Sequence, residues 1–486
     1  MGTRSMKLTN PSLFQQRCYI NGKWITAKKT INVNNPATLE SIGTVPDLES
    51  AHLQQAIAAA EMAWPLWLSK TAKERSELLH RWYTLILENS DDLALLLTIE
   101  QGKPLREAQE EIRYGASFIQ WFAEEAKRVY GDIIPAGLPK QHLFVNKQAI
   151  GVVAAITPWN FPNAMVTRKC APALAAGCTL VLKPSVLTPF SALALAVLAE
   201  KAGIPPGVFN IVTGNSELIG NSFTDSPVIR KLSFTGSTAI GRLLMQKAAH
   251  SIKKISLELG GNAPFIVFED ADIDEAVLGA IASKFRNSGQ TCICTNRFYI
   301  HEKIYDLFTK KFTQASQQLH VGNGQESQVQ IGPLINQAAI KKVEKHIADA
   351  LDKGAELMCG GKKHTLGGSF FQPTVLKNCS ATMLIAQEET FGPVAGLFRF
   401  SEEKEAIALA NATEYGLAAY FYAKNVDRII RVTQALEYGI VGVNTGRTSN
   451  EAAPFGGFKQ SGIGREGSKY GIEDYLEIKY ICLNTE

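Results

Sequence analysis

The sequence predicts an α/β protein with two or three domains, and three observations lead to this fold class. At 486 residues the chain is too long for one small hydrophobic core. Hydrophobic residues make up 45% of it and charged residues 20%, which is typical of a globular protein. Between residues 151 and 260, short apolar runs closed mostly by Gly or Pro alternate with helical stretches.

Five apolar runs in this region predict a parallel, doubly wound sheet, because strands buried on both faces read as continuous apolar runs. Such sheets bind ligands at the carboxyl ends of their strands, so site residues are expected directly after the runs. The expected strands are residues 152–157, 179–184, 209–214, 231–236 and 255–260, and the expected helices are 171–177, 191–203, 216–223 and 238–250.

A second α/β series follows and indicates a second domain. Asp272 and Glu275 resemble a capping box that opens a helix over residues 274–285. A later helix carries an apolar stripe at helical spacing and should end at Gly354; the stripe is Ile340, Val343, Ile347 and Leu351. The expected strands of this domain are residues 263–270, 297–301, 420–425 and 439–444.

Two segments fit neither series. Residues 141–150 and 475–483 read as alternating strands that end near solvent. Unpaired strands of this kind favour edge pairing, and a second subunit is one partner for them. The first 130 residues contain amphipathic helices around residues 59–68 and 75–100.

Bulk composition excludes several function classes. The formal net charge is +4 and no Lys/Arg block stands out, so neither nucleic acid nor an anionic membrane is an expected partner. No run reaches the roughly 18 apolar residues of a membrane span. The first residues lack the apolar core of a signal peptide, and the eight cysteines are mostly scattered. We therefore expect a reducing, cytoplasmic location.

Cys292 and Cys294 stand one residue apart in the stretch 285–297 and admit four interpretations: a metal half-site, a redox pair, a nucleophile with a neighbour, or packing. A metal site is disfavoured because no second cysteine pair exists and no histidine lies in the dense motifs. The turn of residues 289–291 favours an exposed thiolate over a buried small side chain.

Two polar residues follow or end apolar strands. Glu258 lies at the end of an apolar run, where a carboxyl is either a structural group bonded to backbone amides or a general base with a tuned pKa. Asn160 comes directly after a strand, between Pro158 and Pro162. Asn160 either stabilises a turn, as asparagine often does, or points its side-chain N–H at an oxyanion that forms during a reaction.

Three further features suit a nucleotide, although each alone is weak. Gly236 and Ser237 form a glycine turn between a strand and a helix start, where backbone amides bind pyrophosphate. Lys183 ends a neighbouring strand, and Glu389 and Phe391 lie on a Gly-Pro loop.

Together these motifs resemble the aldehyde dehydrogenase superfamily over essentially the whole chain. The motifs in family order are PWNFP, KPS, FTGS, LELGG, GQTC, EETFGP and PFGGFKQSGIGRE. The stretches FRNSGQTCICTNR, NTGRTSNEAAPFGG and GREGSKYGIEDYLEIKY look most like its NAD(P)-dependent succinate-semialdehyde dehydrogenases.

The resemblance implies the fold and its division. A Rossmann-type, doubly wound cofactor domain would take residues 1–130 and 150–258, and a second α/β catalytic domain residues 259–465. A small β oligomerisation element would take residues 131–149 and 466–486, giving a homodimer or homotetramer.

The resemblance also implies the catalytic chemistry. Cys292 would attack the aldehyde, and the Asn160 amide with the Cys292 backbone N–H would hold the oxyanion. Glu258 would activate the water that hydrolyses the thioester, which favours a free acid as product. The cofactor would be NADP, with NAD also used, and no metal is needed. The cofactor-binding residues would be Thr157, Pro158, Trp159, Lys183, Ser185, Gly236, Ser237, Glu389 and Phe391.

In that subgroup a substrate carboxylate is gripped by residues that match Arg168, Arg286 and Ser449. Taken alone, Arg286 is equally well explained as a helix-terminal cation. Arg447 departs from the subgroup, which usually has an aliphatic residue there. This difference leaves open which substrate chain length the site prefers and how tightly it binds the substrate. A glutarate-semialdehyde dehydrogenase is the nearest alternative, because one methylene is worth only about 1–3 kcal/mol in a pocket. A catalytically inactive binding protein is a further alternative, against which the intact Cys292, Glu258 and Asn160 argue.

Two expectations concern regulation and cofactor choice. NAD-selective relatives have an acid where this chain has Val186, so the repulsion of the NADP phosphate is missing here. Cys294 is a candidate redox partner of Cys292, with packing as the equally weighted alternative.

Overall fold

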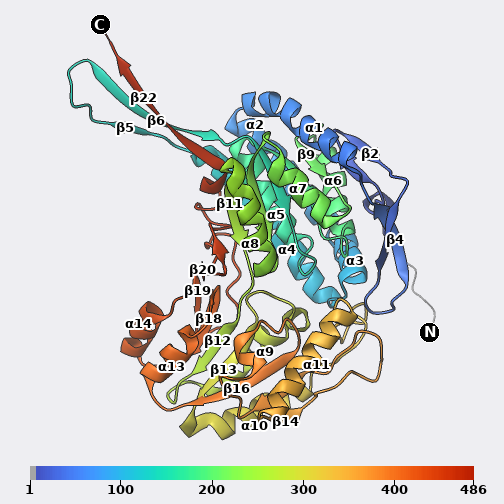
Figure 1. Cartoon of the computed structure of the whole chain (residues 1–486), viewed down its shortest axis with the longest axis vertical. Helices are drawn as coiled ribbons and strands as arrows, with labels where there is room; N and C mark the ends of the chain where they lie inside the picture. The colour runs from blue at the N-terminus through green and yellow to red at the C-terminus, as the bar shows by residue number, and fades with distance from the viewer. Residues whose placement is uncertain (1–6, 486) are drawn as a thin grey trace.

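The computed structural model describes residues 7–485 and confirms the α/β fold class. Figure 1 shows two α/β bodies and a long β arm that projects from the upper one. The interpretation of the extreme N-terminus concerns residues 1–6 and falls outside the described part of the chain.

The first sheet has eight strands in the order β2-β1-β9-β8-β7-β10-β11-β21. The five strands from β9 to β11 run parallel, as the apolar runs predicted. The strands are β1 Cys18–Ile20, β2 Lys23–Ile25, β7 Val152–Ile156, β8 Thr179–Lys183, β9 Phe209–Ile211, β10 Ile229–Thr235, β11 Lys254–Glu258 and β21 Gly462–Ile463.

Helices cover both faces of this sheet, and alternate residues of one strand show it. Val153 and Ala155 of β7 face the cluster formed with α2 to α6, whereas Val152 and Ala154 face α1, α7 and α8. The helices are α1 Ser50–Ser69, α2 Ala72–Glu88, α3 Ser90–Gln101, α4 Leu105–Glu125, α5 Ala164–Ala176, α6 Phe190–Lys201, α7 Ser216–Asp225 and α8 Thr238–Ala248.

The strand order reverses direction between β7 and β10. From β7 the chain first adds β8 and β9 on one side of β7, and it then crosses over to add β10 and β11 on the other side. A crevice for ligands opens at such a switch point, outside the carboxyl ends of the strands. The loops after Ile156 and Thr235 are therefore the ones placed to hold a ligand.

The second sheet has seven strands in the order β14-β15-β16-β13-β12-β18-β19, all parallel except for the edge pair β14 and β15. Its strands are β12 Ala263–Val267, β13 Thr295–His301, β14 Glu356–Cys359, β15 Thr374–Lys377, β16 Val394–Phe400, β18 Ala418–Tyr422 and β19 Ile440–Val443. Its helices are α9 Ile273–Phe285, α10 Tyr305–Gln317, α11 Gln337–Asp352, α12 Leu384–Gln387, α13 Glu403–Asn411 and α14 Val426–Ala435.

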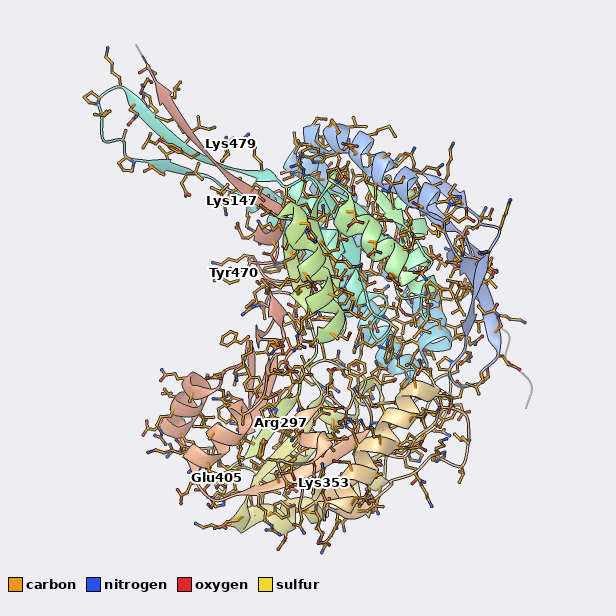
Figure 2. The ribbon with its side chains drawn as sticks, viewed as in Figure 1. Lys147, Arg297, Lys353, Glu405, Tyr470 and Lys479 are labelled. Carbon is orange, nitrogen blue, oxygen red and sulfur yellow. The ribbon has the colours of Figure 1, made fainter. Side chains whose placement is uncertain are left out.

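The residues predicted to begin and end helices in the second α/β body do so, with one difference in their hydrogen bonds. Asp272 caps α9 by accepting from the backbone N–H of Asp274 and Glu275 at 3.1 and 3.2 Å, but no returning bond from the Glu275 side chain closes a capping box. Gly354 follows the end of α11 with a φ of +95°, which suits a helix terminator. Arg297 of β13 is buried in the lower body and donates to Asn262 O at 3.0 Å (Figure 2).

The N-terminal region contains strands that the helical patterns of residues 59–68 and 75–100 did not predict. β1 and β2 form a hairpin around Asn21 and Gly22, and β1 extends the first sheet beside β9. The remaining strand pairs are β3 Thr30–Asn34 with β4 Ser41–Pro46, and β17 Tyr415–Gly416 with β20 Phe458–Lys459.

The two segments outside the domains pair with each other. β6 Gln141–Ala149 and β22 Leu476–Asn484 run antiparallel over nine residue pairs, and β5 Asp132–Ile134 adds a third strand. Lys147 on this arm forms a 2.6 Å ion pair with Glu473, and Figure 2 labels Lys147 and Lys479 along it. β21 lies within residues 259–465 yet pairs with β11 of the first sheet, so the chain returns to the first body before the arm.

Candidate active site

The strand ends of the first sheet carry most of the predicted cofactor residues. Thr157, Pro158 and Trp159 follow β7, Lys183 is the last residue of β8, and Gly236 follows β10. Ser237 caps α8, with its Oγ accepting from the backbone N–H of Ile240 at 3.5 Å. These residues therefore gather around the switch point of the sheet.

Cys292 lies in a tight turn just before β13. The backbone N–H of Cys294 donates to Thr291 O at 3.1 Å and closes the turn. Gly261 lies directly against it, because a Cβ there would come 2.3 Å from Cys292 O. Cys292 is half-buried as a residue, whereas Cys294 is buried.

The surroundings of Cys292 disfavour its charged form in the free protein. Burial raises the pKa of the Cys292 thiol to about 12, the nearby Arg168 charge lowers it, and Glu389 and Glu258 raise it further. The thiol is thus protonated near neutral pH, and a positive charge brought close to it would favour the thiolate.

Asn160 is buried at 4% exposure and contacts the loop that precedes Cys292. Its side-chain Nδ2 donates to Gln290 O at 3.1 Å. Its Oδ1 accepts no hydrogen bond from the described residues. The amide that was predicted to hold an oxyanion is therefore fixed to the cysteine loop by one of its two N–H groups.

Glu258 ends β11 and is 3% exposed, and neither of its carboxyl oxygens is hydrogen-bonded within residues 7–485. Burial raises the pKa of Glu258 well above its usual value, and the charge of Glu466 raises it further. A buried carboxyl without backbone partners does not match the structural alternative considered from the sequence, in which backbone amides hold it.

Glu466 is a site residue that the sequence interpretation did not single out. Arg168 Nη2 lies 2.7 Å from Glu466 Oε2, although the two atoms are not aligned for a hydrogen bond, and Lys169 Nζ donates to Glu466 Oε1. Burial alone would raise the pKa of Glu466, but the charges of Lys169 and Arg168 outweigh it and lower that pKa. Glu258 and Glu466 are thus driven towards opposite protonation states.

Arg286 and Ser449 meet at a small cavity. Arg286 Nη1 donates to Ser449 Oγ at 3.5 Å, and both residues line a cavity of about 180 Å³. Arg447 lines the same cavity, and the others around it are Glu107, Glu110, Glu111, Tyr114 and Phe161. Arg168 does not line this cavity; it is 1% exposed and its guanidinium lies 3.9 Å from the centre of the Phe455 ring.

The groups expected to hold a dinucleotide include buried polar atoms without partners. Lys183 is 5% exposed and donates a long hydrogen bond of 3.4 Å to Pro184 O, but it forms no ion pair within the described residues, and burial lowers its pKa to about 8. Thr157 Oγ1 and Thr235 Oγ1 are buried and make no hydrogen bond within residues 7–485. An uncompensated ammonium and free hydroxyls fit a polyhydroxylated, anionic cofactor.

The remaining cofactor residues lie on two loops. Glu389 Oε1 accepts from the Gly261 N–H at 3.1 Å, and burial raises the pKa of Glu389 to about 7. Phe391 packs edge-on against Trp159, with the ring centroids 5.5 Å apart. Ser185 Oγ accepts from the Leu187 N–H at 3.2 Å, next to Val186.

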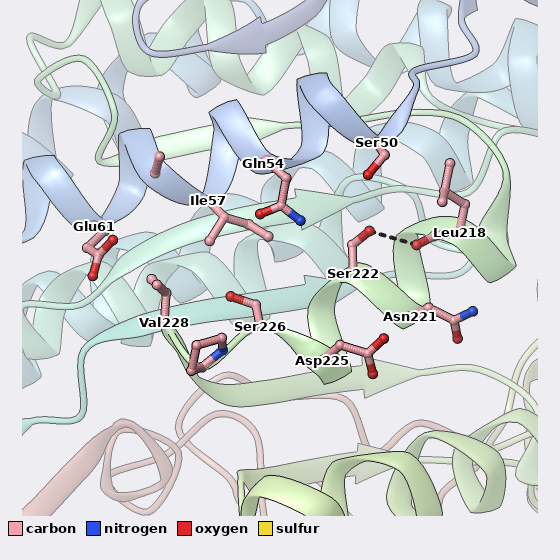
Figure 3. Close-up of a pocket in the computed structure, with 12 residues that line it drawn as sticks. Ser50, Gln54, Ile57, Glu61, Leu218, Asn221, Ser222, Asp225, Ser226 and Val228 are labelled. Atoms are coloured by element: carbon pink, nitrogen blue, oxygen red, sulfur yellow. Dashed lines mark hydrogen bonds between the residues drawn. The ribbon is translucent and has the colours of Figure 1, made fainter.

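A second pocket, of about 530 Å³, lies between α1 and α7 and contains none of the site residues above (Figure 3). The residues that line it include the polar Gln54, Asn221 and Asp225. Within residues 7–485 no group of three or more His, Cys, Asp or Glu side chains is placed to hold a metal ion. In the same part of the chain, every helix is too short or too polar to cross a membrane.

Comparison with known proteins decides the family. The sequence profile of the aldehyde dehydrogenase family matches residues 24–481. The chain belongs to the aldehyde dehydrogenase family. It is 61% identical over 480 residues to the succinate-semialdehyde dehydrogenase (NADP(+)) GabD of Escherichia coli strain K12, covering 98% of this chain and 100% of that protein.

Two further members of this family are similarly close. A glutarate-semialdehyde dehydrogenase of Pseudomonas aeruginosa is 60% identical over 480 residues, covering 98% of this chain and 99% of that protein. The crystal structure of the succinate-semialdehyde dehydrogenase from Burkholderia pseudomallei superposes with a TM-score of 0.98 at 60% identity, covering 99% of this chain and 100% of that one.

Within this aldehyde dehydrogenase, the structure adds residues to those expected from the motifs. Glu466 belongs to the PFGGFKQSGIGRE motif, and an acid in a glycine-rich loop is the sequence feature that would have pointed to it. Lys169 stands beside Arg168 on a helix that is buried all round, where an unpaired cation is costly. Once the helix is known to be buried, that cost indicates a buried acidic partner for Lys169, which is Glu466.

Proposed function

We propose that this protein oxidises succinate semialdehyde to succinate with NADP. The observation that carries the proposal is the cavity in which Arg286 and Ser449 meet, at the start of the loop that leads to Cys292. A guanidinium and a hydroxyl that line one small cavity suit a carboxylate, and we propose that the aldehyde end of the bound substrate extends from there to the Cys292 thiol.

The Cys292 thiolate attacks the aldehyde carbon and forms a thiohemiacetal. The Asn160 amide and the Cys292 backbone N–H stabilise its oxyanion, since donors fixed before the reaction need no reorganisation. NADP, when bound, supplies the acceptor for the hydride. Glu258 then removes a proton from the water that hydrolyses the Cys292 thioester, and burial, which raises the pKa of Glu258, makes its carboxylate a stronger base.

NADP is the cofactor that the strand ends favour, with NAD also accepted. Lys183 is a buried cation without a carboxylate partner in the described residues, and Val186 places no negative charge three residues later. Both features favour the additional phosphate of NADP. The cofactor residues named above, from Thr157 to Phe391, are proposed to surround it.

The deciding experiment compares kcat/KM for succinate semialdehyde, glutarate semialdehyde and butanal, each with NADP and with NAD. The proposal requires kcat/KM to be higher for both semialdehydes than for butanal, and higher for succinate semialdehyde than for glutarate semialdehyde. Preference for butanal contradicts the carboxylate site, and no turnover of any aldehyde contradicts the enzyme assignment altogether.

Glutarate semialdehyde is the second candidate substrate, and one observation favours it. Arg447 lines the cavity beside Arg286, and its guanidinium makes no ion pair or hydrogen bond within residues 7–485. A second cation in the same cavity offers another partner for a carboxylate one methylene more distant from the aldehyde. The kcat/KM ratio of the two semialdehydes decides between them.

We also propose a cytoplasmic homodimer or homotetramer held by the arm. Ile133 is 82% exposed, Ile478 70% and Tyr480 59%, and the outer strands β22 and β5 each have one edge that pairs with no other strand within residues 7–485. Such edges favour pairing with another copy of the chain. Light scattering should report two or four chains, and Ile478→Lys should shift the population towards smaller species; a wild-type monomer contradicts the proposal.

A further inference from the structure

Asn287 lies five residues before Cys292 and has no role in the chemistry described above. It is 1% exposed, and its φ of +50° is left-handed. Ser288 and Gly289 follow with φ values of +56° and +77°, so three consecutive residues adopt this conformation. Non-glycine residues hold it only where surrounding contacts fix them, and such positions cluster at functional sites.

The side chain of Asn287 connects the two halves of the oxyanion site. Its Nδ2 donates to Asn160 O at 2.9 Å and to Gln290 O at 3.2 Å. Gln290 O also accepts from Asn160 Nδ2 at 3.1 Å. One amide group thus fixes both the backbone of Asn160 and the carbonyl that orients the Asn160 side chain.

Asn287 is itself held from three directions. Gln101 Nε2 donates to Asn287 Oδ1 at 3.0 Å, and the Asn287 N–H donates to Glu107 Oε2 at 2.7 Å. The Gln290 side chain and backbone N–H both donate to Asn287 O, at 3.1 and 3.0 Å. These bonds orient the Asn287 amide, since its Oδ1 faces a donor and its Nδ2 faces two carbonyls.

We propose that Asn287 is a positioning residue, which sets the Asn160 amide against the Cys292 turn so that its free N–H meets the developing oxyanion. The proposal rests on the roles of Asn160 and Cys292 in the proposed function. Lys103 Nζ also donates to Asn160 O at 2.8 Å, so the Asn160 loop stays anchored without Asn287 and only its register against the cysteine loop is released.

The chain offers a matched pair of variants. Asn287→Gly removes the side chain and keeps a residue that accepts a left-handed φ. Ser288→Gly is the control, because Ser288 has the same backbone conformation but its Oγ donates to Gly332 O at 2.8 Å, away from Asn160. Both variants put glycine at a residue with a similar left-handed φ, so a difference between them reports the Asn287 side chain.

Two cofactor-free reactions of Cys292 separate positioning from nucleophile damage. With p-nitrophenyl acetate the sulfur–acyl bond forms, p-nitrophenolate leaves, and an oxyanion develops. With iodoacetamide the sulfur–carbon bond forms and iodide leaves, without an oxyanion. Neither reagent is a semialdehyde and neither reaction uses NADP, so a wrong substrate assignment would leave both results unchanged.

In Asn287→Gly, we expect the acylation rate and the kcat/KM for aldehyde to fall together by about 10- to 100-fold, while the alkylation rate stays that of the wild type. Ser288→Gly should keep all three rates. Mass spectrometry identifies Cys292 as the modified residue. Equal loss of acylation and alkylation, or equal loss in both variants, overturns the proposal.

A double-mutant cycle makes the test independent of folding yield. In an Asn160→Ala background, Asn287→Gly should cost nothing more in acylation rate, because the group that it positions is absent. Additive losses contradict the proposal. If Asn287→Gly does not fold, Asn287→Asp replaces it, since it keeps the acceptor for Gln101 and removes both donors.

Discussion

Arg168 and Glu466 form a buried ion pair, with Nη2 and Oε2 2.7 Å apart, and neither residue lines the cavity that Arg286 and Ser449 share. The two arginines that the sequence grouped as substrate ligands therefore have different surroundings. Within residues 7–485 Arg286 forms no ion pair and contacts the Ser449 hydroxyl and the Phe161 ring, whereas Arg168 already has a carboxylate.

Arg286→Ala should raise KM for succinate semialdehyde more than KM for butanal, because loss of a charged hydrogen bond to the substrate carboxylate should cost about 1.5–3 kcal/mol. Arg168→Ala should instead lower kcat for both substrates alike, because Arg168 pairs with Glu466 and does not line the cavity, and Glu466 then keeps Lys169 as its only cation in the described site. Steady-state kinetics on both aldehydes measure this, and equal effects on them would return Arg286 to a helix-terminal role.

Cys292→Ala should abolish aldehyde oxidation and retain cofactor binding, measured by fluorescence titration with NADPH. Burial raises the pKa of the Cys292 thiol to about 12, and only the thiolate reacts. Below that pKa the thiolate fraction rises with pH, so wild-type alkylation by iodoacetamide should quicken about tenfold per pH unit between pH 7 and 9. Full turnover by Cys292→Ala ends the assignment of the nucleophile.

Glu258→Gln should permit hydride transfer and stall hydrolysis of the thioester. The amide keeps the shape of the buried carboxyl but cannot take up a proton. Stopped-flow absorbance should record a burst of reduced cofactor close to one per active site, followed by little turnover. Loss of the burst as well as of turnover means that Glu258 acts earlier or holds the structure.

Wild-type kcat/KM should be higher with NADP than with NAD, and Val186→Glu should reverse the order. A carboxylate at residue 186 repels the phosphate that distinguishes NADP and accepts hydrogen bonds from the free ribose hydroxyls of NAD. Val186→Gln is the control, with similar size and no charge. If NAD is far better than NADP in the wild type, the cofactor proposal is wrong.

Cys294→Ala should keep substantial activity under reducing conditions but lose protection against peroxide. The turn closed between Thr291 O and the Cys294 N–H bends the chain at Cys292 and Ile293, the bend that a bridge between residues this close requires. Peroxide should inactivate the wild type reversibly through a Cys292–Cys294 disulfide, and should over-oxidise the variant irreversibly.

The alternative for Cys294 is packing. Its Sγ lies 3.3 Å from Lys284 O and the residue is 3% exposed. Mass spectrometry of the inactivated wild type separates the two roles. Absence of a Cys292–Cys294 bridge, or equal recovery of both proteins with a thiol, leaves Cys294 as a packing residue only.

The sequence by itself determined the features that depend on near neighbours. Apolar runs of residues 152–157 and 231–236 predicted parallel strands, because burial on both faces demands continuous apolar side chains. Because ligands bind at the carboxyl ends of parallel strands, the residues that come after these runs, such as Asn160 and Ser237, were predicted to lie at the site. Asp272 before α9 and Gly354 after α11 marked helix ends through local hydrogen bonding and backbone conformation.

The tertiary structure alone decided the contacts between distant residues. Glu466 reaches Arg168 across 298 positions of sequence and sets the electrostatics around Glu258. Asn287 joins Gln101, Glu107 and Asn160 in one network. No periodicity encodes such pairs, since each depends on how packed sheets and loops bring polar groups together and leave buried ones without alternatives.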